Sequence, residues 1–218
     1  MNKVNEKPIL FSTAMVKAIL AGRKAMTRRV IKPQPIDIGL AYCWKDCAVH
    51  LGGDKLNQEQ GNREMSYYCP YGKVGDHLWV RETYTIGDYN YKKSAEIIYK
   101  AGGKVNFNGW DEWLDKNTEH AGRCGVVDRW KPSIFMLRKF SRITLKITDI
   151  RVERVQDISS EDAVKEGAEY MEYGEPGIAP LTVAQIVFAS YWDKINAKRG
   201  YSFEINPYVW VISFKVLV

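Results

Sequence analysis

The chain has 218 residues, of which 45% are apolar and 12% aromatic, enough to bury a hydrophobic core and to exclude a wholly disordered protein. No apolar run approaches the roughly 20 residues that span a bilayer, and residues 1–7 are polar, so we expect a cytoplasmic protein with no membrane partner. The net charge of +6 is concentrated near the start, where residues 1–34 hold eight lysines and arginines against one acid, Glu6. This concentration indicates a polyanionic partner, although a solvated basic face would have the same composition.

The first elements surround a basic turn. Residues 8–11 are β-prone, and Ser12 is a suitable N-cap for a helix over 13–21 that Gly22 would end. A strand is expected over 27–31, because the proline-rich segment that follows it would not continue a helix.

The middle of the chain alternates strands with irregular segments. Residues 36–66 are rich in Gly, Asn, Gln and charge, which predicts an insertion with at most a small hairpin over 42–51. A strand is expected over 77–84 and a weaker one over 96–99. Residues 102–129 are again rich in Gly, Asn and Asp, which predicts a second insertion.

The apolar alternation over 142–155 predicts one long strand, and its phase slips near Thr148, which indicates a bulge that bends the strand. Ser159 and Asp162 form a plausible capping box for a short helix over 160–166.

A further helix is expected over 182–197, with Ile186, either Tyr191 or Ser190, and Ile195 facing the core. The chain then ends on a core strand over 208–218.

Strands of mixed length, with short helices between them and no repeating βα unit, indicate an α+β fold built on a small, partly closed mixed β-barrel with flanking helices. We expect a single domain over 1–218, interrupted by the insertions at 36–66 and 102–129. The strands near residues 27–31, 78–83, 142–155 and 209–216 should belong to one sheet.

Several reaction classes lack their motifs. The sequence holds no G-x-S-x-G, H-E-x-x-H or P-loop pattern, and its three histidines lie in separate segments. Four cysteines are too few for a disulfide scaffold, and we expect no cofactor and no metal. Cys43, Cys47, Cys69 and His50 leave a zinc site open as the alternative, although their spacing is irregular.

The turn over 22–29 is the best candidate site. Lys24 and Thr27 can project from it, while Arg23, Arg28 and Arg29 surround them with positive charge. Neighbouring cations and partial burial both lower the pKa of a lysine, which makes it a base or nucleophile near neutral pH. The same cluster would also bind phosphate, and its alternative interpretation is a solvated basic turn.

Four segments resemble the ASCH-domain proteins of bacteriophages and prophages, and together they span most of the chain. They are ILAGRKAMTRR (19–29), CPYGKVGDHLWVRETY (69–84), WKPSIFMLRKFSRITLKITDIRVERVQDISSEDAVKEG (130–167) and WDKINAKRGYSFEINPYVWVISFKV (192–216). This resemblance implies a PUA-like fold, which is a mixed β-barrel with flanking helices, and binding of RNA or modified nucleobases.

The chain also resembles a smaller bacterial ASCH amidohydrolase that removes the acetyl group from N4-acetylcytidine with a lysine, a threonine and a glutamate. Its lysine and threonine match Lys24 and Thr27, and its glutamate falls on Glu166 by register. The resemblance implies that Lys24 is the base, Thr27 the nucleophile or oxyanion donor, and Glu166 the proton shuttle. The chain departs from most phage members at Ala25 and Met26, and again over 135–137, where they often carry a histidine.

The leading hypothesis is therefore a protein that binds a nucleoside, nucleotide or RNA near Lys24 and hydrolyses an acylated cytidine. A second hypothesis is a binding module without catalysis, in which the arginines of the turn bind phosphates and Trp79 or Trp130 stacks on a base. A third is a phage-encoded protein that binds a host protein through the two insertions.

Overall fold

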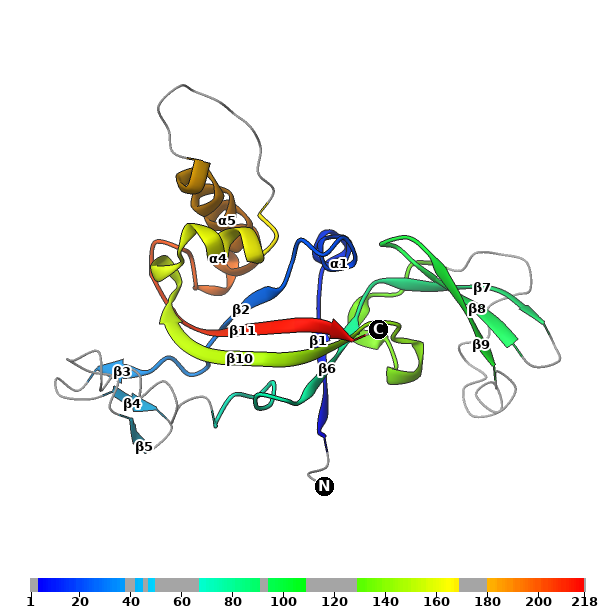
Figure 1. Cartoon of the computed structure of the whole chain (residues 1–218), viewed down its shortest axis with the longest axis horizontal. Coiled ribbons are helices and arrows are strands. Elements are labelled where there is room, and N and C mark those ends of the chain that lie inside the picture. Colours follow the sequence, from blue (N-terminus) through cyan, green and yellow to red (C-terminus); the bar gives the residue numbers. More distant parts are fainter. Residues whose placement is uncertain are drawn as a thin grey trace.

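The computed structural model describes residues 4–37, 42–44, 47–49, 67–90, 94–108, 129–168 and 180–217. Its centre is a five-stranded sheet in the order β1-β6-β10-β11-β2 (Figure 1). Only the β1–β6 pair is parallel, and the other three pairs are antiparallel. The strands are β1 (Glu6–Leu10), β2 (Met26–Val30), β6 (His77–Arg81), β10 (Thr144–Arg154) and β11 (Tyr208–Leu217).

All four segments expected to share a sheet contribute a strand to it, which confirms that prediction. The expected irregularity is also present, because the β10–β11 register shifts between Ile147 and Asp149. Both strands curve strongly along their length (Figure 1). The bulge therefore lies where the alternation of apolar residues slips in the sequence.

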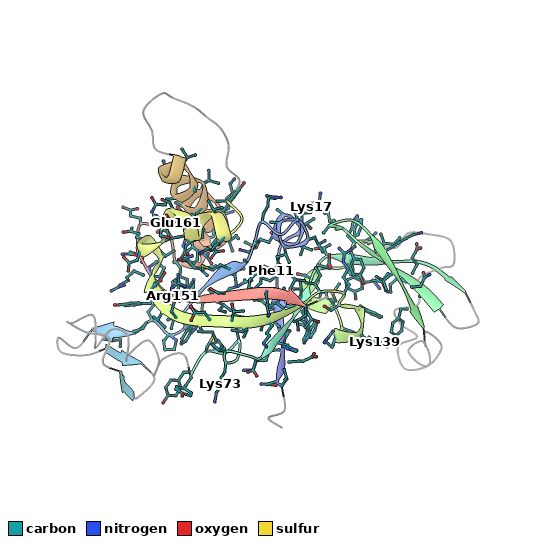
Figure 2. All side chains as sticks on the ribbon, in the orientation of Figure 1. Phe11, Lys17, Lys73, Lys139, Arg151 and Glu161 are labelled. Carbon is teal, nitrogen blue, oxygen red and sulfur yellow. The ribbon has the colours of Figure 1, made fainter. Side chains whose placement is uncertain are left out.

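The fold is α+β as expected, but the barrel is not closed. The edge strands β1 and β2 do not pair with each other within the described residues. They are joined by helix α1 (Thr13–Leu20), whose Val16 and Ile19 are fully buried in the core with Phe11. Figure 2 shows Phe11 between α1 and the central sheet. Helix α1 thus covers the core on the side where pairing of β1 with β2 would have closed the sheet into a barrel.

Two helix N-caps form at the serines that the sequence predicts. Ser12 Oγ accepts a hydrogen bond from the Met15 N–H at the start of α1, and Gly22 after its end has a φ of 71°. Ser159 Oγ accepts one from the Asp162 N–H at the start of α4 (Ser160–Lys165). These caps satisfy backbone donors that have no partner inside the helix.

Helix α5 (Pro180–Asn196) packs with α4 on the other face of β2 and β11. Its buried side chains are Ala184, Phe188 and Trp192, at a spacing of four residues. The expected core stripe is wrong, since Ile186, Tyr191 and Ile195 are 63%, 43% and 41% exposed. Ile186 and Ile195 are nine residues apart, which places them about 180° apart around the helix. Ala184, Phe188 and Trp192 are spaced by four and share one face, and the rings of Phe188 and Trp192 bury a large apolar area against the sheet.

Two small antiparallel sheets lie at opposite ends of the central one (Figure 1). The first contains β3 (Ile36–Asp37), β4 (Tyr42–Trp44) and β5 (Cys47–Val49), and the second contains β7 (Tyr84–Asn90), β8 (Ser94–Tyr99) and β9 (Lys104–Asn108). The hairpin expected over 42–51 corresponds to β4 and β5, whereas β9 lies in a segment for which no strand was predicted. The remainder of both expected insertions lies outside the described residues, apart from short segments at their ends. Short 3₁₀ helices span Ser133–Phe135, Arg138–Phe140, Val155–Asp157 and Ala197–Arg199.

Candidate active site

Backbone hydrogen bonds fix the turn that carries Lys24. The N–H groups of Arg23 and Lys24 both donate to the Ala18 carbonyl of α1, at 2.9 and 3.1 Å. The next N–H, of Ala25, donates to the Lys165 carbonyl at the end of α4, at 2.9 Å. Lys24 is therefore held between two helices that are far apart in the sequence.

The structure brings Lys24 and Glu166 into direct contact. Lys24 Nζ lies 2.6 Å from Glu166 Oε2 and 2.7 Å from the Glu166 backbone carbonyl oxygen. Lys24 is only 2% exposed, and the Glu166 side chain is 6% exposed. Burial lowers the pKa of Lys24, and the charges of Arg29 and Arg28 lower it further, while Glu166 opposes the shift.

A glycine makes this contact possible. Gly167, which follows α4, has a φ of 87°, in the left-handed region that favours glycine. A Cβ at this position would lie 3.3 Å from the Lys24 Cβ and 3.2 Å from the Ala18 Cβ. The end of α4 thus approaches Lys24 so closely because residue 167 has no side chain.

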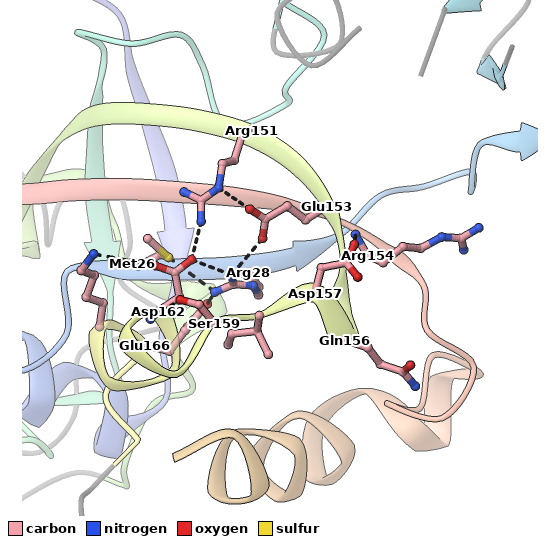
Figure 3. Close-up of polar contacts among 12 residues, drawn as sticks. Met26, Arg28, Arg151, Glu153, Arg154, Gln156, Asp157, Ser159, Asp162 and Glu166 are labelled. Carbon is pink, nitrogen blue, oxygen red and sulfur yellow. Dashed lines mark hydrogen bonds and ion pairs between the residues drawn. The ribbon is translucent and has the colours of Figure 1, made fainter. Parts of the chain in front are cut away.

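Arg28 contacts the second oxygen of the Glu166 carboxylate. Its Nη1 lies 3.5 Å from Glu166 Oε1, and its Nη2 lies 3.0 Å from both Glu153 Oε2 and Asp162 Oδ2 (Figure 3). Arg151 also pairs with Glu153 and Asp162. Three carboxylates thus surround the fully buried Arg28 side chain.

The positive charges of this network lower the pKa of Asp162. Burial by itself would raise that pKa, but the hydrogen bond from Arg28 and the positive charge of Arg151 hold it below its ordinary value. Asp162 therefore stays ionised and orients Arg28 against Glu166.

A cavity of about 800 Å³ lies beside these groups. Its walls come from α1, β2, the end of α4, α5 and the segment around Tyr71. Thr27 and Glu166 both line it, whereas Lys24 lies behind Glu166 and is not part of the lining. Glu166 is the only acidic residue among the described lining residues, against six cationic ones, Arg23, Arg28, Arg29, Lys32, Lys194 and Arg199.

Aromatic rings form much of the remaining wall. The lining includes Tyr68, Tyr71, Phe188, Tyr191, Trp192 and Trp210. Phe188 and Trp192 pack against each other with ring centroids 6.0 Å apart, and the Arg28 guanidinium lies 5.8 Å from the Phe188 centroid. Flat apolar walls with cations beside them suit a ligand that combines a planar ring with negative charge.

The residues expected to bind nucleic acid separate into two groups. Arg23 and Arg29 line the cavity, and so does Arg28, although its charge is compensated by carboxylates. Trp79 is buried in β6 and Trp130 is exposed elsewhere, and neither lines the cavity.

Sequence reasoning missed the aromatic and basic residues of the last helical segment. Phe188 and Trp192 are spaced by four residues, which is the one sequence signal that could have marked the buried face of α5. Lys194 and Arg199 carry no local signal of their role, because only the packing of α5 against β2 brings them to the cavity.

The zinc alternative gains no support in the described part of the chain, where no three potential ligands cluster. Cys69 is buried, and burial raises its pKa to about 11, so that it carries little thiolate. The side chains of Cys43 and Cys47, and His50 as a whole, lie outside the described residues. Within that same part of the chain, every helix is too short or too polar to cross a membrane.

Comparison of the chain with models of known protein families, with curated proteins and with solved structures finds no match.

Proposed function

We propose that the chain is an ASCH-type protein of the PUA-like superfamily that binds a nucleobase-bearing ligand in this cavity and hydrolyses an N-acyl amide on the base. The substrate class is an N4-acylated cytidine. One observation carries the proposal: a buried Lys24–Glu166 pair, with 2.6 Å between Nζ and Oε2, adjoins a cavity that Thr27 also lines. The resemblance to the smaller bacterial ASCH amidohydrolase, which the residues alone support, points to the same three positions.

Amide hydrolysis needs a base to activate water, a donor for the oxyanion and an acid for the departing amine. Glu166 Oε1 is buried and has no hydrogen-bond partner among the described residues, so it can accept a proton from a water or from the Thr27 hydroxyl. Lys24 Nζ donates a short hydrogen bond of 2.6 Å to Glu166 Oε2, so a proton can pass between the two side chains. The lowered pKa of Lys24 makes its neutral amine accessible as the base of this pair.

The proposed hydrolysis consists of two proton transfers through the Lys24–Glu166 pair. Water attacks the acyl carbon and gives a proton to the Lys24–Glu166 pair, while the Thr27 hydroxyl donates a hydrogen bond to the developing oxyanion. The C–N bond breaks as the pair returns a proton to the exocyclic nitrogen. The products are a carboxylic acid and cytidine with a free amine.

The edge of β2 offers a means to hold the base. The N–H of Ile31 and the carbonyl of Ala25 both form hydrogen bonds with β11. In an antiparallel pair, every second residue directs its N–H and C=O to the partner strand, and the residues between them direct theirs to the opposite edge. Arg28 is one of these intervening residues, so its N–H and C=O face the free edge of β2. No strand pairs with that edge in the described part of the chain. A base that hydrogen-bonds there would lie near the rings of Phe188 and Trp192.

The test is chromatographic detection of cytidine released from N4-acetylcytidine by the full chain. Glu166→Gln should lower the rate about 10²-fold or more, as for a positioned acid or base. Thr27→Val should also lower it, because valine keeps the branched shape but has no hydroxyl. The matched control is Lys17→Met, an exposed lysine of α1 outside the cavity lining, which should not change the rate. Wild-type activity that survives Glu166→Gln and Thr27→Val would contradict the proposal.

A binding module without catalysis is the second candidate, and the absence of Lys24 from the cavity lining favours it. In that case the Lys24–Glu166 pair only joins α4 to the turn. The chain would then bind nucleosides or nucleotides without turnover, and Glu166→Gln would leave their affinity nearly unchanged.

A further inference from the structure

Arg28 and Arg29 are adjacent on β2 but differ in their electrostatic surroundings. Arg28 has carboxylate oxygens of Glu153 and Asp162 at 3.0 Å. Arg29 has no carboxylate within ion-pair distance among the described residues, although it also lines the cavity. The charge of Arg28 is therefore compensated by ion pairs, whereas Arg29 forms none among the described residues and feels the Glu166 carboxylate only at longer range.

The local contacts of Arg29 hold its guanidinium without neutralising it. Nη2 donates to the Leu10 carbonyl at 2.6 Å, and the guanidinium lies 5.0 Å from the centroid of the Phe11 ring. Nε is buried and has no hydrogen-bond partner in the described chain. A buried donor without a partner is costly, and a ligand that supplies an acceptor removes that cost.

A second cation acts on the same region. Burial lowers the pKa of Arg29; Tyr71 and Glu166 oppose this shift, and the positive charge of Arg199 adds to it. Lys32 and Lys194 line the same cavity, and neither forms an ion pair with a carboxylate within the described residues. Cations that repel one another across a cavity create a potential that favours an anion.

The position of Arg29 relates this anion site to the proposed chemistry. Thr27 and Arg29 are two residues apart on one strand, so their side chains leave the same face, about 7 Å apart along it. An anion at Arg29 thus lies next to the groups proposed to act on the base.

We propose that the cavity contains a phosphate subsite formed by Arg29 with Arg199, so that the ligand is a 5′-mononucleotide and not a free nucleoside. The nucleobase part of this inference rests on the proposed function. The phosphate part rests on Arg29, whose charge no ion pair compensates among the described residues. A mononucleotide is favoured over RNA because the cavity has walls from α1, β2 and α5, and its volume of about 800 Å³ is that of a small-molecule site.

The experiment is calorimetric titration of the full chain with each of the four ribonucleosides and N4-acetylcytidine, and with the 5′-monophosphate of each. At least one monophosphate should bind about tenfold or more tightly than its nucleoside, as expected for a charge-assisted bond to phosphate. Arg29→Gln should abolish that difference, lowering the affinity for the monophosphate far more than the affinity for the nucleoside. The preference for the monophosphate should also weaken as salt is raised.

Arg81→Gln is the matched control. Arg81 also has a buried Nε without a partner among the described residues, and it lies 4.7 Å from the centroid of the Trp79 ring, but it does not line the cavity. This variant should keep the preference for the monophosphate.

The outcomes separate the two proposals. Equal affinities for all nucleosides and their monophosphates would overturn the phosphate subsite, even if N4-acetylcytidine is hydrolysed. Tighter binding of a monophosphate without any hydrolysis would support the subsite and count against the catalytic proposal. Tighter binding of a cytidine-containing oligoribonucleotide without a terminal phosphate than of any monophosphate would overturn the inference in favour of RNA.

Discussion

Arg28 Nη1 lies 3.5 Å from Glu166 Oε1, the oxygen of that carboxylate that Lys24 does not contact. The two cations hold the Glu166 carboxylate from different sides. Asp162 and Glu153 in turn hold Arg28. The orientation of the proposed proton shuttle therefore depends on residues that have no part in the reaction.

Arg28 is accordingly a positioning residue for Glu166. Arg28→Lys should lower kcat for N4-acetylcytidine about tenfold with little change in KM, because an ammonium cannot contact several carboxylates in the fixed geometry of a guanidinium. A change in KM alone would contradict this role.

The control for that variant is Arg142→Lys. Arg142 forms two hydrogen bonds of 2.9 Å to Glu82, which is buried, at a site away from the cavity. This variant should lower stability without changing kcat.

The Lys24–Glu166 pair should show strong coupling in stability. Lys24→Met leaves a buried carboxylate with less compensation, so it should lower the free energy of unfolding by about 3 kcal/mol or more. Lys24→Met combined with Glu166→Leu should cost less than the sum of the two single variants, because no buried charge of the pair remains. Urea denaturation of the four proteins measures this coupling, and additive losses would mean that the contact is energetically unimportant.

Asp162 should make the stability depend on acid pH. Its pKa is lower in the folded chain than in the unfolded chain, so the unfolded state binds more protons between the two values. Its contribution is present above the unfolded pKa of about 3.9 and is lost as the pH falls through the folded pKa. Urea unfolding at a series of pH values should therefore show Asp162→Asn less stable than wild type at pH 7, with the difference shrinking at acid pH. A difference that grows below pH 4 would contradict the assignment.

Gly167→Ala should destabilise the fold more than Gly200→Ala. Both glycines have φ values in the left-handed region, 87° and 82°, so both variants incur the same kind of backbone strain. Only at residue 167 would the new Cβ approach other atoms, the Cβ atoms of Ala18 and Lys24. Thermal unfolding of both variants isolates that contact, and equal shifts in Tm would show that the approach of α4 to Lys24 is not tight.

Cys69 should resist alkylation in the folded protein. Its thiol is buried and its pKa is raised to about 11, so roughly 0.1% would be thiolate at pH 8. Mass spectrometry of the Cys69 peptide after iodoacetamide treatment should show labelling only when urea is present. Rapid labelling of the native chain would contradict the burial of this side chain.

Residues that are close in the sequence determined several local features of this protein. Ser12 and Ser159 cap the helices that follow them, and the slip at Thr148 marks the bulge in β10, because each depends on residues close in sequence. The basic turn with Lys24 and Thr27 was likewise evident from adjacent residues. The contact of Glu166 with Lys24 could be expected only through a resemblance, since 142 positions separate them.

Only the tertiary structure decided which of these charges are available to a ligand. Arg28 and Arg29 are neighbours of the same residue type, yet they point to opposite faces of β2. One meets the carboxylates of α4 and β10, while the other meets the aromatic ring of Phe11 and an open cavity. The buried face of α5 was misjudged from the sequence, and the sequence did not decide how far the partly closed barrel would close. Both depend on which long-range packing buries the most apolar area, and an apolar pattern along one element does not identify its partner.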